Sequence, residues 1–398
     1  MTSLVILGAA DGAVPTYQRA AKLGYRTICV DVRSGAPAVP LADEYLHIST
    51  RAPEQIVAAL AGRDDIVGVL APASDIALPA QRTLAEHWGL PNPISEAAVL
   101  ASADKSHFRA VCDRLGFPTY GSVAGTVGPD LRAAALALRF PTLVKPVDST
   151  GSRGVVPCGG PGGLTAAVAQ AIEHSPSGRV IVEEHLDGEH LTVEALVVDG
   201  RVAFHAVSAR TITPPPYFIT SGQWLPAELP AAVDAELIAM MNTLCTELRY
   251  VSGPLNLDVV LSADGLLYLI EMGARTGGNA LAELIETSYG VDTLAASIAL
   301  AVGEPVVVTP REPRPVLMWV LAADRPGTLA AVHGVAEVKA MPEFVDLRMF
   351  VEPGDHVQPY TQAANKLGYV LLAGGSAAEL RAAAAHVDRT LHVELAAP

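Results

Sequence analysis

The sequence predicts a multidomain protein that combines a parallel α/β domain with α+β domains. Its 398 residues are more than a single hydrophobic core usually serves. Over residues 1–93, apolar runs alternate with helical segments, which is typical of a parallel sheet covered by helices. After residue 117, short strands come in pairs joined by turns, which is typical of antiparallel sheets. We therefore expect a mixed architecture with two kinds of sheet.

The N-terminal α/β domain is predicted to cover residues 1–93. We expect buried strands at residues 3–8, 25–31 and 66–70, with helices at 16–23 and 55–61. The turn after the first strand, followed later by Asp31, has some likeness to a dinucleotide site. However, Ala10 and Ala13 stand where the G-x-G-x-x-G pattern needs glycine, so we interpret the turn as a strand-turn-helix connection without a cofactor.

Two further domains are predicted, at residues 94–308 and 309–398, and the former includes a central lid subdomain at residues 117–188. Apolar strands flank Asp199-Gly200 and, further on, the turn at residues 263–265, and both sequences favour tight connections between antiparallel strands. A proline-rich linker at residues 310–315 leads into strands and an alanine-rich helix after Ser376. The chain is thus predicted to finish in a small α+β domain.

Composition argues against several classes of function. The net charge is -15 and no run of Lys and Arg occurs, so neither a nucleic acid nor an anionic membrane is expected as the main partner. The four cysteines lie far apart without a CxxC pair, so neither a zinc site nor a dithiol is indicated. The N-terminus lacks a basic segment before its apolar run, and no stretch reaches the length of a membrane span. We expect a soluble, cytoplasmic protein.

A glycine-rich loop, Asp148-Ser149-Thr150-Gly151-Ser152-Arg153-Gly154, follows the apolar strand at residues 142–144. Small residues let backbone N–H groups approach phosphate oxygens closely. Lys145 precedes the loop and can reach a phosphate as a point charge. The loop lacks the Gly-Lys-Ser/Thr ending of a Walker A motif, and by itself it is better explained as an ordinary surface turn.

The segment Glu183-Glu184-His185-Leu186 ends another apolar strand, at residues 180–182. Adenine requires a hydrogen-bond acceptor for its amino group, a backbone N–H for a ring nitrogen and an apolar slot. A strand end of this kind can supply all three. Two adjacent glutamates are usually just solvated, so this segment is informative only together with the phosphate loop.

Two carboxylates stand in otherwise apolar strands: Asp258 in one strand of a hairpin and Glu271 at the end of the other. Such groups are costly to bury unless they are paired or bound to metal. Across an antiparallel pair they could face one another and hold Mg²⁺. Arg275 suits a phosphoryl group in transfer, although a structural ion pair with Glu271 is the alternative. The adjacent Gly277 and Gly278 would let backbone amides contact a substrate carboxylate.

Together these motifs resemble the ATP-grasp superfamily and, more narrowly, carboxylate–amine ligases of the L-amino acid ligase (dipeptide synthetase) type. The resemblance implies an ATP-grasp fold behind a pre-ATP-grasp domain, with ATP and Mg²⁺ or Mn²⁺ as cofactors, and a homodimer. It implies that Asp258 and Glu271 hold the metal, that Arg275 stabilises the transferred phosphate, and that Arg210 contacts phosphate. The implied nucleotide contacts are Lys105, Lys145, Ser149, Thr150, Gly151, Ser152, Gly154, Glu183, Glu184 and Leu186.

The chain departs from the family pattern at three places. Relatives often have a ribose-binding Glu just before residue 192, where this chain offers Glu189 or His190. Gly273 stands where superfamily members commonly have Asn. Thr220 and Gln223 stand where related ligases tend to have Glu and His, so we expect an unusual substrate. The full predicted substrate set is Thr220, Gln223, Gly277, Gly278 and Asn279.

The resemblance implies an ADP-forming ligase. ATP would phosphorylate a carboxylate, and an amine would attack the acyl phosphate to give an amide or peptide bond, with an amino acid as at least one substrate. Two alternatives stay open: a carboxylase or purine-pathway-like ligase, and a nucleotide-binding protein without turnover. The sequence does not name the acid or the amine.

Overall fold

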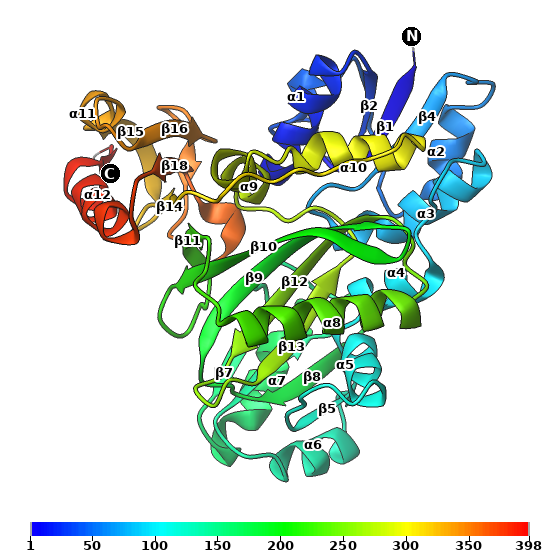
Figure 1. Ribbon diagram of the computed structural model, residues 1–398. Helices are drawn as coiled ribbons and strands as arrows, with labels where there is room; N and C mark the ends of the chain where they lie inside the picture. Colours follow the sequence, from blue (N-terminus) through cyan, green and yellow to red (C-terminus); the bar gives the residue numbers. More distant parts are fainter. Residues whose placement is uncertain (1, 397–398) are drawn as a thin grey trace.

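The computed structural model describes residues 2–396 and contains the predicted mixture of parallel and antiparallel sheets (Figure 1). The N-terminal sheet is wholly parallel, in the order β3-β2-β1-β4. Its elements are β1 (Ser3–Leu7), α1 (Val14–Lys22), β2 (Arg26–Val30), β3 (Glu44–Leu46), α2 (Pro53–Ala59), β4 (Ile66–Leu70) and α3 (Leu78–His87). The predicted strands and helices are confirmed, whereas β3 and α3 were not predicted. The Asp31 carboxylate accepts a hydrogen bond from the Ala9 backbone and pairs with Arg33, so both oxygens have structural partners.

Two short helices carry the chain from the N-terminal domain to the rest of the molecule. They are α4 (Glu96–Ala103) and α5 (Lys105–Arg114). Asp104 separates them because its extended backbone ends α4 while its side chain caps α5, accepting from the backbone N–H groups of Ser106 and His107. Lys105 is therefore fixed as the first residue of α5.

A four-stranded antiparallel sheet, in the order β5-β8-β6-β7, lies within residues 117–188. Its elements are β5 (Ser122–Thr126), α6 (Pro129–Leu136), β6 (Thr142–Pro146), β7 (Val156–Cys158), α7 (Leu164–Ile172) and β8 (Arg179–Glu184). Both helices pack on one face and bury a small core that includes Leu131, Val144, Leu164 and Val182. The other face of the sheet lies toward the large sheet, across the cleft that residues of both sheets line.

An eight-stranded sheet forms the body, in the order β13-β12-β9-β10-β11-β14-β18-β16. Its strands are β9 (Glu189–Val198), β10 (Arg201–Ile212), β11 (Thr220–Leu225), β12 (Gly253–Leu261), β13 (Leu267–Gly273), β14 (Val316–Leu321), β16 (Phe344–Met349) and β18 (Gly368–Ala373). Both predicted hairpins are confirmed. At the β9–β10 turn Asp199 and Gly200 have φ of 50° and 75°, the left-handed pair that a two-residue hairpin requires.

Three helices cover this sheet: α8 (Ala231–Glu247), α9 (Leu281–Tyr289) and α10 (Thr293–Val302). α8 packs against β10 (Figure 1). Its buried residues belong to the core that also includes residues of the N-terminal domain. α10 packs against both β4 and β12, so it ties the N-terminal sheet to the body.

The C-terminal part adds a second small sheet, β17-β15-β19, and two helices. These elements are β15 (Gly327–His333), α11 (Val335–Lys339), β17 (His356–Val357), α12 (Ala377–Thr390) and β19 (His392–Leu395). The alanine-rich helix is confirmed as α12, capped by Ser376. The strands β14, β16 and β18, however, continue the large sheet across the predicted boundary at residue 308. The helices within residues 2–396 lack the length and apolar composition that a membrane crossing requires.

Candidate active site

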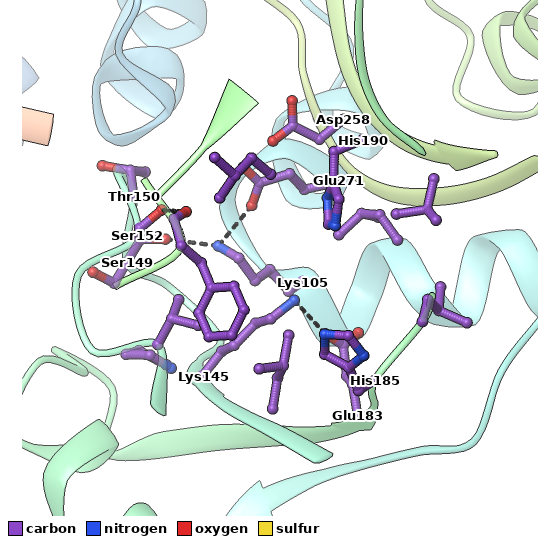
Figure 2. Close-up of a pocket in the computed structure, with 18 of the residues that line it drawn as sticks. Lys105, Lys145, Ser149, Thr150, Ser152, Glu183, His185, His190, Asp258 and Glu271 are labelled. Carbon is purple, nitrogen blue, oxygen red and sulfur yellow. Dashed lines mark hydrogen bonds and ion pairs between the residues drawn. The ribbon is translucent and has the colours of Figure 1, made fainter. Parts of the chain in front are cut away.

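A cleft lies between the four-stranded sheet and the large sheet, and most of the predicted nucleotide and metal residues line it (Figure 2). They come from α5, from both sheets and from the glycine-rich loop. The predicted residues that line the cleft are Lys105, Lys145, Ser149, Thr150, Gly151, Ser152, Glu183, Glu184, Leu186, His190, Arg210, Asp258 and Glu271. Apolar side chains, among them Leu143, Val155 and Phe218, supply the rest of the wall.

Four cations line the cleft, and three of them, all but Arg153, are paired with a carboxylate. Lys105 Nζ lies 3.1 Å from Glu271 Oε2 and donates to the Ser149 carbonyl at 2.7 Å. Lys145, on β6, lies 2.7 Å from Glu183 Oε2, on the neighbouring strand β8. These two pairs are visible in Figure 2 as dashed contacts.

The third pair joins Arg210, on β10, to Asp258, on β12, at 2.7 Å. Asp258 Oδ1 also accepts from the hydroxyl of Thr192, on the intervening strand β9. The cleft therefore contains three ion pairs between Lys or Arg and a carboxylate. A bound phosphate could take over the cations, and a divalent cation could take over the carboxylates.

The carboxylates of Asp258 and Glu271 are neighbours because the two residues are direct partners in the β12–β13 register. Leu267 and Leu269 point into the core, but after an irregularity in the register the buried positions become Met272 and Ala274. This bulge shifts the alternation by one residue, so Glu271 faces the cleft instead of the core.

Two adjacent carboxylates with oxygen donors fit Mg²⁺, the hard cation that prefers such ligands. No cluster of three or more His, Cys, Asp or Glu side chains that could hold a metal occurs within residues 2–396. The protein thus offers Asp258 and Glu271, and the other ligands of a metal here would come from a bound phosphate and water.

The electrostatics of the cleft keep one group charged and another neutral. Burial would raise the pKa of Glu271, but the nearby cations, Lys105 foremost, outweigh burial and lower that pKa below its usual value. Burial lowers the pKa of His190 to about 4, and Arg210 adds to the effect. His190 is therefore a neutral hydrogen-bonding group at pH 7. Its neighbour Glu189 is exposed and does not line the cleft, so of the two predicted ribose contacts the position of His190 suits the role.

The glycine-rich loop connects β6 to β7 through a run of left-handed residues. Gly151, Ser152 and Gly154 have φ of 66°, 60° and 74°. A Cβ on Gly154 would lie 2.8 Å from His174 Cβ and 2.8 Å from Pro146 Cγ, so only glycine fits there. Gly154 thus shapes the loop, while the preceding residues line the cleft.

Arg275 does not itself line the cleft, but it is near enough to Glu271 to help lower the pKa of that carboxylate. It donates from Nη2 to Oδ2 of Asp75 at 2.8 Å and from Nη1 to Oδ1 of Asn256 at 2.9 Å. Asp75 comes from the N-terminal domain, directly before α3, so Arg275 joins two domains. The predicted alternative, an ion pair of Arg275 with Glu271, is replaced by this pair with Asp75.

Glu194 is a buried carboxylate that the sequence analysis missed. Its oxygens accept from the Gly277 backbone at 2.9 Å and from Asn256 Nδ2 at 3.0 Å. Burial raises its pKa to about 7, and Arg275 nearby only partly opposes this. Glu194 thus anchors both the loop after Arg275 and the amide that holds Arg275. A charged residue in the otherwise apolar strand at residues 191–198 was the available signal.

The predicted substrate residues fall in two places. Gly277, Gly278 and Asn279 line a small pocket with Asp11, where Lys366 of the C-terminal part lies 2.7 Å from Asp11 and donates to Asn279 at 2.9 Å. Thr220 and Gln223 are buried in β11 and line none of the cavities described in this section. The Gln223 amide donates to the Ser208 hydroxyl at 2.9 Å, which is a contact within the sheet.

Two family models match the chain. One describes an ATP-grasp domain and matches residues 138–283, and the other describes C-terminal domain 2 of L-amino acid ligases and matches residues 319–396. Residues 138–283 therefore belong to an ATP-grasp domain. The second match shows that residues 319–396 are similar to a C-terminal domain of L-amino acid ligases.

Relatives of this chain differ in how much of their sequence they share with it. Protein y4rH of Sinorhizobium fredii is 26% identical over 77% of this chain and 64% of that protein. Carnosine synthase 1 of Gallus gallus is 30% identical over 39% of this chain and 18% of the synthase. A formate-dependent phosphoribosylglycinamide formyltransferase of Stutzerimonas stutzeri is 27% identical over 84% of this chain and 83% of that protein. The chain thus spans less than two thirds of the first two relatives.

Solved structures with the same fold include an L-amino acid ligase from Bacillus licheniformis, with a TM-score of 0.82 and 20% identity over 100% of this chain and 99% of the ligase. A phosphoribosylglycinamide synthetase from Anaerococcus prevotii has a TM-score of 0.78 and 18% identity over 99% of this chain and 100% of the synthetase. At these identities the likeness establishes the ATP-grasp fold across the whole chain.

Proposed function

We propose that this protein is an ATP-dependent carboxylate–amine ligase. ATP phosphorylates a carboxylate, and an amine displaces phosphate from the acyl phosphate to form an amide, with ADP and phosphate released. An amino acid is at least one of the two substrates. The observation that carries the proposal is the cross-strand pair Asp258 and Glu271, which shares one cleft with Lys105 and Lys145.

The residues of the cleft divide the work of binding ATP. Lys105 and Lys145 contact the phosphates together with backbone groups of the loop Ser149–Gly154. The strand end at Glu183–Leu186 receives adenine between apolar side chains. The side chain of Glu183 is already bound to Lys145 and to the Tyr120 hydroxyl, so recognition of adenine falls to the backbone of this segment.

Asp258 and Glu271 would hold Mg²⁺, which offsets the charge of the phosphates when bound. Arg275 lies beyond Glu271, and its guanidinium stabilises the oxygens of the transferred group. Asn256 and Asp75 fix the orientation of that guanidinium. The glycine-rich loop closes over the site and excludes water, since an acyl phosphate hydrolyses readily.

The choice of an amino acid as substrate is supported by the C-terminal match to L-amino acid ligases. It is also supported by the similarity to an L-amino acid ligase and to a carnosine synthase. Lys366 beside Asn279 gives the C-terminal part a buried cation close to the glycine pair, where a carboxylate could be bound.

A substrate screen tests the proposal. The protein is incubated with ATP, Mg²⁺ and pairs of carboxylates and amines, and ADP, phosphate and amide products are measured. ADP formed only when both partners are present supports a ligase, and Glu271→Gln serves as a control that should lose turnover while remaining folded. AMP and pyrophosphate as products, or ATP binding without phosphate release across a broad screen, would contradict the proposal.

A second candidate is favoured by one observation, the match to a formate-dependent formyltransferase over 84% of this chain. Activation of formate or bicarbonate would use the same cleft with a smaller acid. Including both small acids in the screen separates the candidates, because the amino-acid ligase should ignore them.

A further inference from the structure

A second cavity, of about 400 Å³, lies between the N-terminal domain and the cleft. It shares four lining residues with the cleft, namely Lys105, Ser149, Thr150 and Glu271. The two spaces therefore meet where the phosphoryl group would be transferred. A substrate held in the second cavity would reach that point without entering the nucleotide site.

Asp75 lines this cavity with an incomplete set of hydrogen bonds. The residue is only 8% exposed, and its Oδ2 is held by Arg275 at 2.8 Å. Its Oδ1 is buried and has no hydrogen-bond partner within residues 2–396. A buried acceptor without a donor is costly, so this oxygen is suited to a ligand that brings an N–H or O–H. The Ser149 hydroxyl, on the same cavity, is likewise buried without a partner.

Gly273 makes room for Asp75. A Cβ at residue 273 would collide with Asp75 Oδ1 and would lie 2.7 Å from Arg275 Cζ. Superfamily members commonly have Asn at this position, and here the carboxylate of Asp75 and the guanidinium of Arg275 occupy the space of that side chain. The departure from the family pattern is therefore matched by a charged group supplied from another domain.

We propose that Asp75 binds the amine substrate, which occupies the second cavity and donates an N–H to Asp75 Oδ1 while Arg275 holds Oδ2. The inference rests on the proposed ligase function and names the site of its second substrate. Of the two substrates, the carboxylate would be repelled by Asp75. An amine instead carries N–H donors for this oxygen, and its protonated form is attracted to the carboxylate. The amine then lies next to Glu271 and Lys105, where the acyl phosphate forms.

Asp75→Asn tests the assignment. Because Arg275 requires an acceptor, the Asn oxygen takes the place of Oδ2, and the amide NH₂ faces the cavity and cannot accept from an amine. The KM for the amine should rise by about tenfold or more. The KM values for ATP and for the carboxylate should stay within a factor of about two. Hydroxylamine at saturating concentration traps the acyl phosphate as a hydroxamate without using the amine site. The KM for the amine should therefore rise by a larger factor than the rate of hydroxamate formation falls.

Asp31→Asn is the matched control, because Asp31 is a buried carboxylate of the same domain with both oxygens bonded away from the cavity. It should leave the KM for the amine unchanged. Thr83→Phe, at an exposed position on the rim of the second cavity, provides a variant that leaves the core intact. It should raise the KM for a bulky amine more than that for a small one.

An unchanged KM for the amine in Asp75→Asn would overturn the assignment. So would a fall in the rate of hydroxamate formation as large as the rise in the KM for the amine, because Asp75 would then serve phosphorylation through Arg275 alone. An unchanged KM for bulky amines in Thr83→Phe would place the amine elsewhere. These results differ from a failure of the ligase proposal, in which the wild-type protein itself forms no hydroxamate with any carboxylate.

Discussion

Gly273→Ala should disable the enzyme by adding a single methyl group. The new Cβ would lie 2.7 Å from Arg275 Cζ and closer still to Asp75 Oδ1. Ordinary carbon–carbon contact begins near ~3.5 Å, so the guanidinium would have to move by about 0.8 Å. Neither group can swing aside freely, because Arg275 is also bound to Asn256 and both side chains are mostly buried.

The magnitude follows from what this displacement does to catalysis. A misplacement of about 1 Å at a reacting centre can lower the rate by roughly a hundredfold. We therefore expect kcat/KM for amide formation to fall by about a hundredfold, with ATP affinity little changed because Arg275 does not line the nucleotide cleft. Initial rates of ADP release and equilibrium binding of a fluorescent nucleotide measure the two quantities.

Gly159→Ala is the matched control. A Cβ there meets nothing within 4 Å, and the residue has no left-handed φ, so the same chemical change should be silent. If Gly273→Ala kept more than about a third of wild-type kcat/KM, the close packing of Asp75 and Arg275 against residue 273 would not matter for activity, and the reasoning would be refuted.

Three further predictions concern the groups around this pair. Arg275→Ala should lower kcat by about a hundredfold or more at unchanged nucleotide affinity, and survival of activity would remove Arg275 from the transfer step. Asp258→Asn should raise the Mg²⁺ concentration for half-maximal activity by about tenfold or more, as measured by metal titration at fixed ATP. The folded protein keeps a proton on Glu194 up to a pKa of about 7, whereas an ordinary Glu loses it near 4.5, so stability falls as pH rises through that window. The Glu194→Gln side chain cannot ionise. Its free energy of unfolding should therefore rise by about 3 kcal/mol relative to that of the wild type between pH 4 and pH 8. The difference in thermal midpoint between the two proteins should grow over this range, and a constant difference would contradict the prediction.

Much of the cleft was predictable because its residues break a local pattern. Asp258 and Glu271 are charges in apolar strands, and their hairpin makes them neighbours without any long-range information. The same is true of the Asp199-Gly200 turn, whose residue types require left-handed conformations. The three-residue strand β3 was missed since so short a segment carries no periodicity.

Residues that act across domains were not predictable in this way. Asp75 and Arg275 are separated by 200 positions, and nothing in the spacing of either segment reveals the contact. Gly273 adjoins the carboxylate of Asp75, and the local sequence around residue 273 does not reveal that neighbour. Thr220 and Gln223 were chosen by analogy with relatives, but their burial in β11 is set by which strands lie on either side, namely β10 and β14.

The large sheet has a consequence for how this protein could be taken apart or recombined. β14 forms backbone hydrogen bonds with β11, so a truncation near residue 309 would not release a finished unit. It would strip β11 of a neighbour and leave a row of unsatisfied N–H and C=O groups, which invites pairing with other molecules. It would also remove Tyr360, whose hydroxyl donates to the Thr220 carbonyl. Chimaeras that exchange the terminal segment between relatives should therefore carry β11 with it, so that the seam runs through a loop and not between two paired strands.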